Sequence, residues 1–370
     1  MDLLNTTGMA AGYTMGMEPS GRELLMVAVK GTFDFPAQGG VAERSEEQVP
    51  LIAADTFSGE PGLSAPLCEA DYAPKKPHCD VILNGSAYAP DGKPVRELTV
   101  GLRVGDLQKV FRVVGDRVWR AAPIGFSPGE PIPFDVMPIT YDRAFGGVDR
   151  LHPDEKKHDP YMQNPVGCGY HAVLEPDLVN GTPVPNTEES GRPISDPKSA
   201  YRPMSFGPVG RGWAPRYQYA GTYDDDWLEN CFPFLPPDFD DRYYQCAPED
   251  QQLGNIVGGE EVKLYHLTPE GRTSFHLPTN EVPVVFFYKR GDDYKTLART
   301  DTLCIEPDAR RLTITWRAHI PLRRNMFEIS QVLVGQMSRA WWRARAIGKT
   351  YYPSIEAAVK AKAEPELTDE

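Results

Sequence analysis

The chain has 370 residues, of which 41% are hydrophobic and 10% aromatic, and it contains 36 prolines and 33 glycines. This composition excludes a collagen-like chain, a coiled coil and a disordered polymer, and it favours a loop-rich fold with many short elements. The net charge of −13 argues against nucleic-acid and anionic-membrane partners, because binding to phosphates requires positive charge.

The N-terminal residues show no secretion signal, since no Lys or Arg precedes Arg22 and no long apolar stretch follows. The longest apolar runs, residues 24–29 and 282–288, are far shorter than the roughly 20 residues that span a bilayer. The six cysteines form no C-x-x-C pair, which indicates reduced thiols. We therefore expect a cytoplasmic protein without membrane insertion.

Residues 1–122 are predicted to form a first β-rich section. Apolar, β-branched segments alternate with turn signals such as Asn84-Gly85 and Gly115-Asp116. Short strands at this spacing favour an antiparallel sandwich or open barrel. The expected strands are residues 24–35, 79–84, 97–104, 109–114 and 117–121.

Residues 123–255 form a second section, rich in proline and aromatic residues. Twenty of the 36 prolines lie between residues 123 and 253, so long strands and helices are not expected there. The high density of aromatic side chains nevertheless indicates ordered loops packed on the β scaffold. One helical turn is expected at residues 223–230, capped by Asp224 or Asp225.

Residues 256–325 return to a β-rich pattern, and residues 326–370 are predicted to form a helical C-terminal segment. In the third section, Leu312, Ile314 and Trp316 alternate with Thr313, Thr315 and Arg317, which places the two sets on opposite faces of a strand. Residues 326–334 fit either a strand or the start of a helix, and residues 364–370 are expected to fray. The expected strands are residues 261–267, 272–277, 282–289, 294–306 and 311–320, and the expected helices are residues 336–347 and 354–363. The fold class is thus mainly β.

Two segments carry opposite charge. Residues 224–261 contain eleven acidic residues and one basic residue, and residues 310–349 contain nine basic residues and one acidic residue. The segments either face each other or are simply solvated, or they form two docking surfaces that accelerate and orient association.

Local motifs for catalysis or metal binding are weak. A cluster of potential metal ligands has neither zincin nor zinc-finger spacing, and no metal or cofactor is expected. Its members are His152, Asp154, His158, Asp159, Cys168 and His171. The Asp runs at 224–226 and 238–241 match no EF-hand loop, and the glycines at 207–212 match no nucleotide loop; a backbone with positive φ is expected for those glycines. No catalytic residue is therefore assigned.

A long, ordered set of motifs occurs at residues 21–23, 27–33, 141–147, 164–167, 206–208, 213–216, 220–224, 227, 234–240 and 247–252. Together these motifs resemble the domain-of-unknown-function family encoded beside bacterial type VI secretion genes. The resemblance implies a non-enzymatic adaptor or chaperone that binds a type VI effector. It would help load the effector onto the spike, either a valine-glycine-repeat protein or a PAAR-type tip protein.

The family motifs also supply the residues that we single out as protein-binding or motif positions. For most of them a structural role is the simpler interpretation, with effector recognition in the loops between; Arg216, for instance, is expected to pair with Asp224 or Asp240. These positions are Arg143, Phe145, Trp213, Arg216, Tyr223, Trp227, Asp238, Phe239, Asp240 and Gln251.

Two other functions stay open. A carbohydrate or peptidoglycan hydrolase would use two carboxylates of the acidic region across a cleft. A toxin-neutralising immunity protein would also bind an effector, but it would block the effector's activity.

Overall fold

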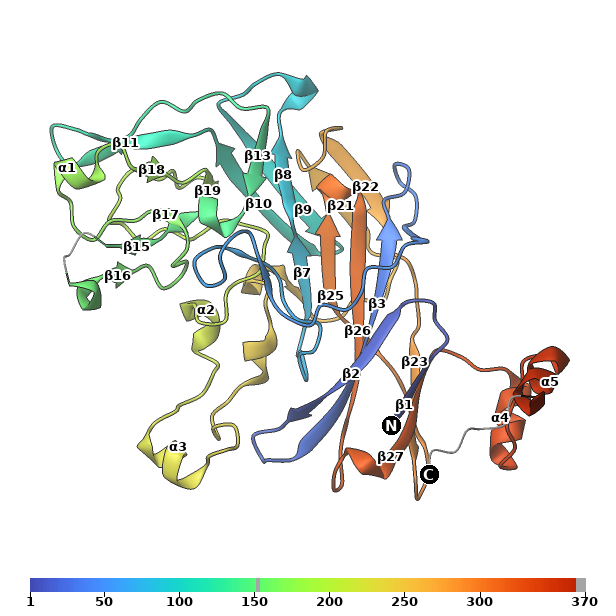
Figure 1. The fold of residues 1–370 in the computed structure, drawn as a ribbon. Coiled ribbons are helices and arrows are strands. Elements are labelled where there is room, and N and C mark those ends of the chain that lie inside the picture. The colour runs from blue at the N-terminus through green and yellow to red at the C-terminus, as the bar shows by residue number, and fades with distance from the viewer. Residues whose placement is uncertain (151–153, 364–370) are drawn as a thin grey trace.

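A computed structural model describes residues 1–150 and 154–363 of the chain. The fold is mainly β, with several sheets and a few short helices, as the sequence predicts (Figure 1). Within the described residues, none of the sheets closes into a barrel. Residues 364–370, for which fraying was expected, lie outside the described part.

A seven-stranded sheet forms the centre of the molecule. Its longest pair is β3 (Glu23–Asp34) and β26 (Arg311–Pro321), which run antiparallel in unbroken register. Strands from the first and third sections of the sequence therefore share one sheet. The remaining strands are β2 (Ala10–Met17), β4 (Glu43–Arg44), β25 (Arg299–Glu306), β7 (Cys79–Leu83) and β20 (Gln252–Leu253).

Two further sheets combine strands that are distant in sequence. The five-stranded sheet contains β19 (Thr187–Glu189), β10 (Leu107–Val114), β9 (Glu97–Val104), β21 (Glu261–Tyr265) and β22 (Arg272–His276), in that order. The four-stranded sheet contains β1 (Asp2–Asn5), β27 (Ile329–Val334), β23 (Pro283–Tyr288) and β24 (Tyr294–Leu297), with β1 parallel to β27.

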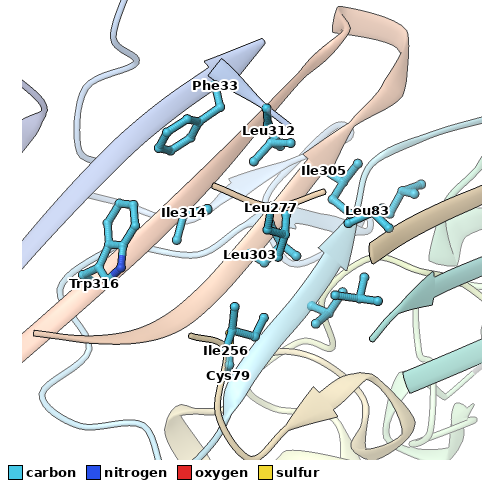
Figure 2. Packing of buried hydrophobic residues seen from close by; sticks show 14 of the residues in the cluster. Phe33, Cys79, Leu83, Ile256, Leu277, Leu303, Ile305, Leu312, Ile314 and Trp316 are labelled. Carbon is cyan, nitrogen blue, oxygen red and sulfur yellow. The ribbon is translucent and has the colours of Figure 1, made fainter. Parts of the chain in front are cut away.

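The three large sheets share one hydrophobic core. Side chains of β26, such as Leu312 and Ile314, meet Leu303 and Ile305 of β25 and Leu83 of β7 (Figure 2). The same cluster continues into the five-stranded and four-stranded sheets. The alternation that the sequence shows along residues 312–320 thus buries one face of β26 in this core.

The predicted strands agree closely with the structure, apart from one that is split and several that were not predicted. Residues 294–306 form two strands separated at Ala298, because the first pairs with β23 and the second with β26. Strands β1 and β2 and the short strands at residues 43–44, 56–57, 66–68 and 85–88 were not predicted. In β2 the larger side chains alternate with Gly and Thr, and this pattern was overlooked.

The middle region contains only short elements. Small ladders and helical turns connect loops, and Asp224 accepts a hydrogen bond from the N–H of Trp227 at the start of α3, as the sequence predicts. The strands of this region are β12 (Phe126–Pro128), β13 (Val136–Ile139), β14 (Phe145–Gly146), β15 (Val148–Asp149), β16 (Asp159–Pro160), β17 (Cys168–Gly169) and β18 (Pro183–Val184). The first section contributes the further short strands β5 (Thr56–Phe57), β6 (Pro66–Cys68), β8 (Gly85–Tyr88) and β11 (Arg117–Ala121). The helices are α1 (Pro176–Val179), α2 (Ala214–Tyr217) and α3 (Asp225–Asn230).

The C-terminal segment, which was predicted to be helical, begins with a helical turn and a strand. Residues 326–328 form a helical turn, and β27 follows, which resolves the ambiguity of residues 326–334. Helix α4 (Arg339–Ala346) packs Trp341 and Trp342 against Phe287 of β23, on the face of the four-stranded sheet away from the main core. Helix α5 (Ile355–Ala363) lies beside α4 in Figure 1.

Candidate functional site

Residues 217–244 form an exposed surface that we call the aromatic lobe, and Figure 1 shows it projecting away from the sheets around α3. Aromatic rings stabilise it from within: the Trp227 ring lies 4.8 Å from that of Tyr223 and 5.7 Å from that of Phe232. The Trp227 indole N–H also donates to the carbonyl of Phe234 at 3.0 Å. Large apolar side chains remain 46–64% exposed, namely Tyr217, Tyr223, Leu228, Phe232 and Phe234.

The aromatic lobe is strongly acidic, with seven carboxylates and one basic residue, Arg242. Several of these carboxylates have structural contacts. Asp238 accepts hydrogen bonds from the Thr222 N–H at 2.9 Å and the Thr222 hydroxyl at 2.8 Å, and these bonds lower the pKa of Asp238. The guanidinium of Arg242 likewise lowers the pKa of Asp240. The lobe is therefore negatively charged at neutral pH.

Arg216 fixes the base of the aromatic lobe. Its buried guanidinium pairs with Glu69, and it donates to the carbonyls of Val209 at 2.8 Å and Tyr243 at 2.7 Å. The expected pairing with Asp224 or Asp240 is wrong, because Glu69 comes from a loop distant in sequence. Sequence reasoning missed Glu69, since nothing in its local sequence marks it as buried.

A second arginine strengthens this base. Arg211 contacts Asp55 at 3.0 Å and Glu69 at 3.3 Å. Burial alone raises the pKa of Asp55, but hydrogen bonds from Arg211 and from the Ala70 N–H outweigh it and hold that pKa below its usual range. Both carboxylates are therefore partners of buried or half-buried arginines.

The remaining predicted positions lie apart from the exposed face of the lobe. Phe145 is fully buried among Tyr161, Tyr170 and Tyr201. Trp213 packs edge-on against Tyr141 with ring centres 5.2 Å apart, and the Arg143 guanidinium lies 3.3 Å from Asp116 and 3.0 Å from the Asn186 side-chain oxygen. Phe239 belongs to the lobe but is half-buried, and it packs on Tyr243 and Tyr244.

Gln251 joins the middle region to the central sheet. Its fully buried amide donates to the carbonyls of Val81 at 2.7 Å and Phe206 at 2.9 Å. Its oxygen accepts from Lys109 of β10 at 2.6 Å, and burial lowers the pKa of Lys109 to about 8. Of the ten predicted positions, only Tyr223 and Trp227 belong to the exposed aromatic cluster of the lobe.

The second face of β26 is also buried, under residues 49–77. There Lys30 pairs with Asp71 at 2.8 Å, and the guanidinium of Arg317 pairs with Asp301. Beside these pairs lies a cavity of about 100 Å³, which Cys68 and Cys304 help to line. Each charge has a partner of opposite sign, so we interpret this network as the attachment of the covering segment to the sheet. The signals in the sequence are Lys30 and Arg317, each inside an apolar strand pattern.

The weak chemical motifs do not converge in the structure. His152 lies outside the described residues, and within the described ones no group of three potential ligands is placed to hold a metal ion. Burial raises the pKa of the Cys168 thiol to about 12, so it is protonated and a poor nucleophile. All six cysteines are free thiols, as expected.

The glycine loop at 207–212 differs from the sequence interpretation. None of its three glycines has a positive φ. Gly210 is instead required by close packing, because a Cβ there would lie 2.4 Å from the indole nitrogen of Trp213. The loop therefore serves to seat Trp213 beside Arg216.

The two segments of opposite charge are not joined by ion pairs in the part of the chain that the structure describes. Acidic residues of the first segment pair instead with Lys75, Lys109, Arg202, Arg242 and Lys263. The interpretation in which they neutralise each other through direct contacts therefore loses support. Much of the acidic charge stays on the aromatic lobe.

The structure thus defines a mainly β protein with an exposed, acidic aromatic lobe. The sequence signature of the uncharacterized proteins conserved in bacteria, DUF2169, matches residues 20–317, and the chain belongs to this family. Neither a curated protein nor a solved structure matches the chain. Across residues 1–150 and 154–363, the helices are too short or too polar to cross a membrane.

Proposed function

We propose that the protein is a non-enzymatic cytoplasmic adaptor that binds a type VI secretion effector and helps load it onto the spike, either a valine-glycine-repeat or a PAAR-type protein. The type VI context rests on the motif resemblance described above. The observation that supports a binding function is the aromatic lobe, where Tyr217, Leu228 and Phe232 are each more than half exposed on an ordered scaffold. Exposed aromatic clusters of this kind are typical of protein-protein interfaces.

The contacts of the acidic residues favour an adaptor over a hydrolase. A glycosidase needs two carboxylates that face a cleft about 5–10 Å apart. In the lobe, by contrast, Asp224 caps a helix, Asp238 closes a loop onto Thr222 and Asp240 binds Arg242. These carboxylates already have structural partners, so we interpret them as groups that hold the loops of the lobe in place.

The proposal is tested with the purified protein and the effector encoded beside it. We expect a stable complex by size-exclusion chromatography, and we expect deletion of the adaptor gene to abolish delivery of that effector while other effectors are still secreted. Unchanged delivery after deletion would contradict the adaptor function. Co-expression with the active toxin distinguishes an adaptor from an immunity protein. An immunity protein must restore the growth of cells that produce the toxin, whereas an adaptor need not.

A substitution on the aromatic lobe tests where the effector binds. We expect Leu228→Ser to weaken the complex about tenfold in a calorimetric titration, since the exposed Leu228 side chain would lose its contact with water on binding. The matched control is Ile124→Ser, which removes a 94% exposed apolar side chain from the turn between β11 and β12. Equal affinities for the two variants would move the binding site away from the lobe.

A further inference from the structure

Strand β2 ends the seven-stranded sheet, and it pairs on one side only, with β3. Figure 1 shows it at the outer border of the sheet. Its eight residues follow β3 in continuous register, from Ala10 opposite Lys30 to Met17 opposite Glu23. The strand is therefore long and regular for an edge strand.

Printed contacts of β3 establish which residues of β2 face outward. The N–H of Phe35 donates to Arg310, and the N–H of Leu322 donates to Glu23, so odd-numbered residues of β3 face β26 and even-numbered ones face β2. Gly12 lies opposite Ala28, so even-numbered residues of β2 bond to β3. The N–H and C=O groups of the odd-numbered residues point away from the sheet. These residues are Ala11, Tyr13, Met15 and Met17.

The outer edge of β2 lacks the features that usually prevent strand addition. Native edge strands carry Lys, Pro or a bulge, whereas β2 has no charged residue, no proline and no register shift. Within the described residues, no backbone or side-chain group bonds to the outward N–H and C=O groups. A strand of another polypeptide would satisfy them.

An apolar groove adjoins one end of this edge. It has a volume of about 450 Å³, and Met15, Met17, Met326 and Phe327 line it, with Phe327 71% exposed. Glu23 is its one charged lining residue. Methionine side chains adapt to differently shaped partners, so this groove suits an apolar side chain on the added strand.

We propose that β2 receives an extended, uncharged segment of the effector as an additional strand, with an apolar side chain of that segment seated in the methionine groove. This inference rests on the proposed adaptor function and names the segment that the adaptor holds. The net charge of −13 opposes the approach of a second copy of the chain, which favours a different protein as the occupant. Main-chain hydrogen bonds would provide affinity, and the groove would provide selectivity.

Amide hydrogen exchange, resolved by residue, tests the pairing directly. In the free protein, the amides of Gly12, Thr14 and Gly16 are expected to exchange slowly and those of Tyr13 and Met15 rapidly. Saturation with the purified effector encoded beside the gene should slow Tyr13 and Met15. If they stay rapid in a saturated complex, the strand addition is refuted while the adaptor function stands. If no complex forms, both proposals fail.

Two variants of one residue provide the matched control. Tyr13→Pro removes an outward N–H that β3 does not use, and we expect it to weaken effector binding roughly tenfold. Tyr13→Ala keeps the N–H and should bind nearly as the native chain does. An equal loss of affinity in both variants would assign the contact to the Tyr13 side chain and overturn the strand pairing. The proposal would also be overturned if, without effector, the Tyr13 amide exchanged more slowly as the adaptor concentration increased, because a second copy of the chain would then pair with β2.

Discussion

The central sheet and the proline-rich middle region are stabilised by different bonds. In the sheet, β3 and β26 exchange backbone hydrogen bonds over eleven paired positions, and apolar side chains fill the space between sheets. In the middle region, single polar side chains such as Asn164, Arg216 and Gln251 bind several backbone carbonyls each. The comparison shows that prolines, which prevent ladders, leave carbonyls that buried side chains must satisfy.

The largest effect is expected from breaking such a contact in the middle region. Arg216→Ala removes the more deeply buried of the two arginine partners of Glu69 and two carbonyl contacts, and it should lower the free energy of unfolding by about 3–5 kcal/mol. Urea denaturation measures the loss, and limited proteolysis should show cleavage within residues 209–244 first. The control is Arg211→Ala, whose side chain is 37% exposed and whose loss should cost at most about 1 kcal/mol. Equal losses would contradict the anchoring role of Arg216.

A substitution in the central core should act on the whole fold. Leu303 is fully buried between sheets, and Leu303→Ala should destabilise the protein by about 2–5 kcal/mol through lost burial and the cavity that remains. Circular dichroism and tryptophan fluorescence should then report one common transition. Leu297→Ala, at a position 53% exposed, should change stability by no more than about 0.5 kcal/mol. Early proteolysis confined to the middle region would show that this region unfolds before the sheet, which would contradict a common transition.

The contact between the regions predicts a dependence on pH. Lys109 has a folded-state pKa of about 8, below its ordinary value of 10.5, because it is buried. Between these values the unfolded chain binds more protons, so this group adds stability as pH rises from 8 to 10.5, by about 3 kcal/mol in total. Lys109→Met should lack that rise in urea denaturation at pH 7.5, 9 and 10.5. Parallel pH profiles for the native chain and the variant would refute the lowered pKa.

Much of the sheet architecture was predictable because local patterns report it. Strand β9 matches its predicted bounds, and the alternation from Leu312 to Ile320 identified the face of β26 that lies in the main hydrophobic core. The pairing of β3 with β26 was not predictable, since neither strand indicates its distant partner. Less of the candidate site could be predicted from the sequence. Arg216 was identified from a motif, but its partner Glu69 is far away in sequence. Exposure of Leu228 depends on how α3 projects from the fold, which no local pattern encodes.

The position of β26 in the central sheet has a consequence during synthesis. Strand β3 leaves the ribosome early, whereas its longest neighbour is translated near the end of the chain. An incomplete chain therefore leaves the apolar side chains of β3 and the edge that pairs with β26 exposed for most of translation. Contacts between residues so distant in sequence also form slowly. We expect nascent chains to need a holding chaperone until residues 311–321 emerge, so truncation before that point should yield insoluble product.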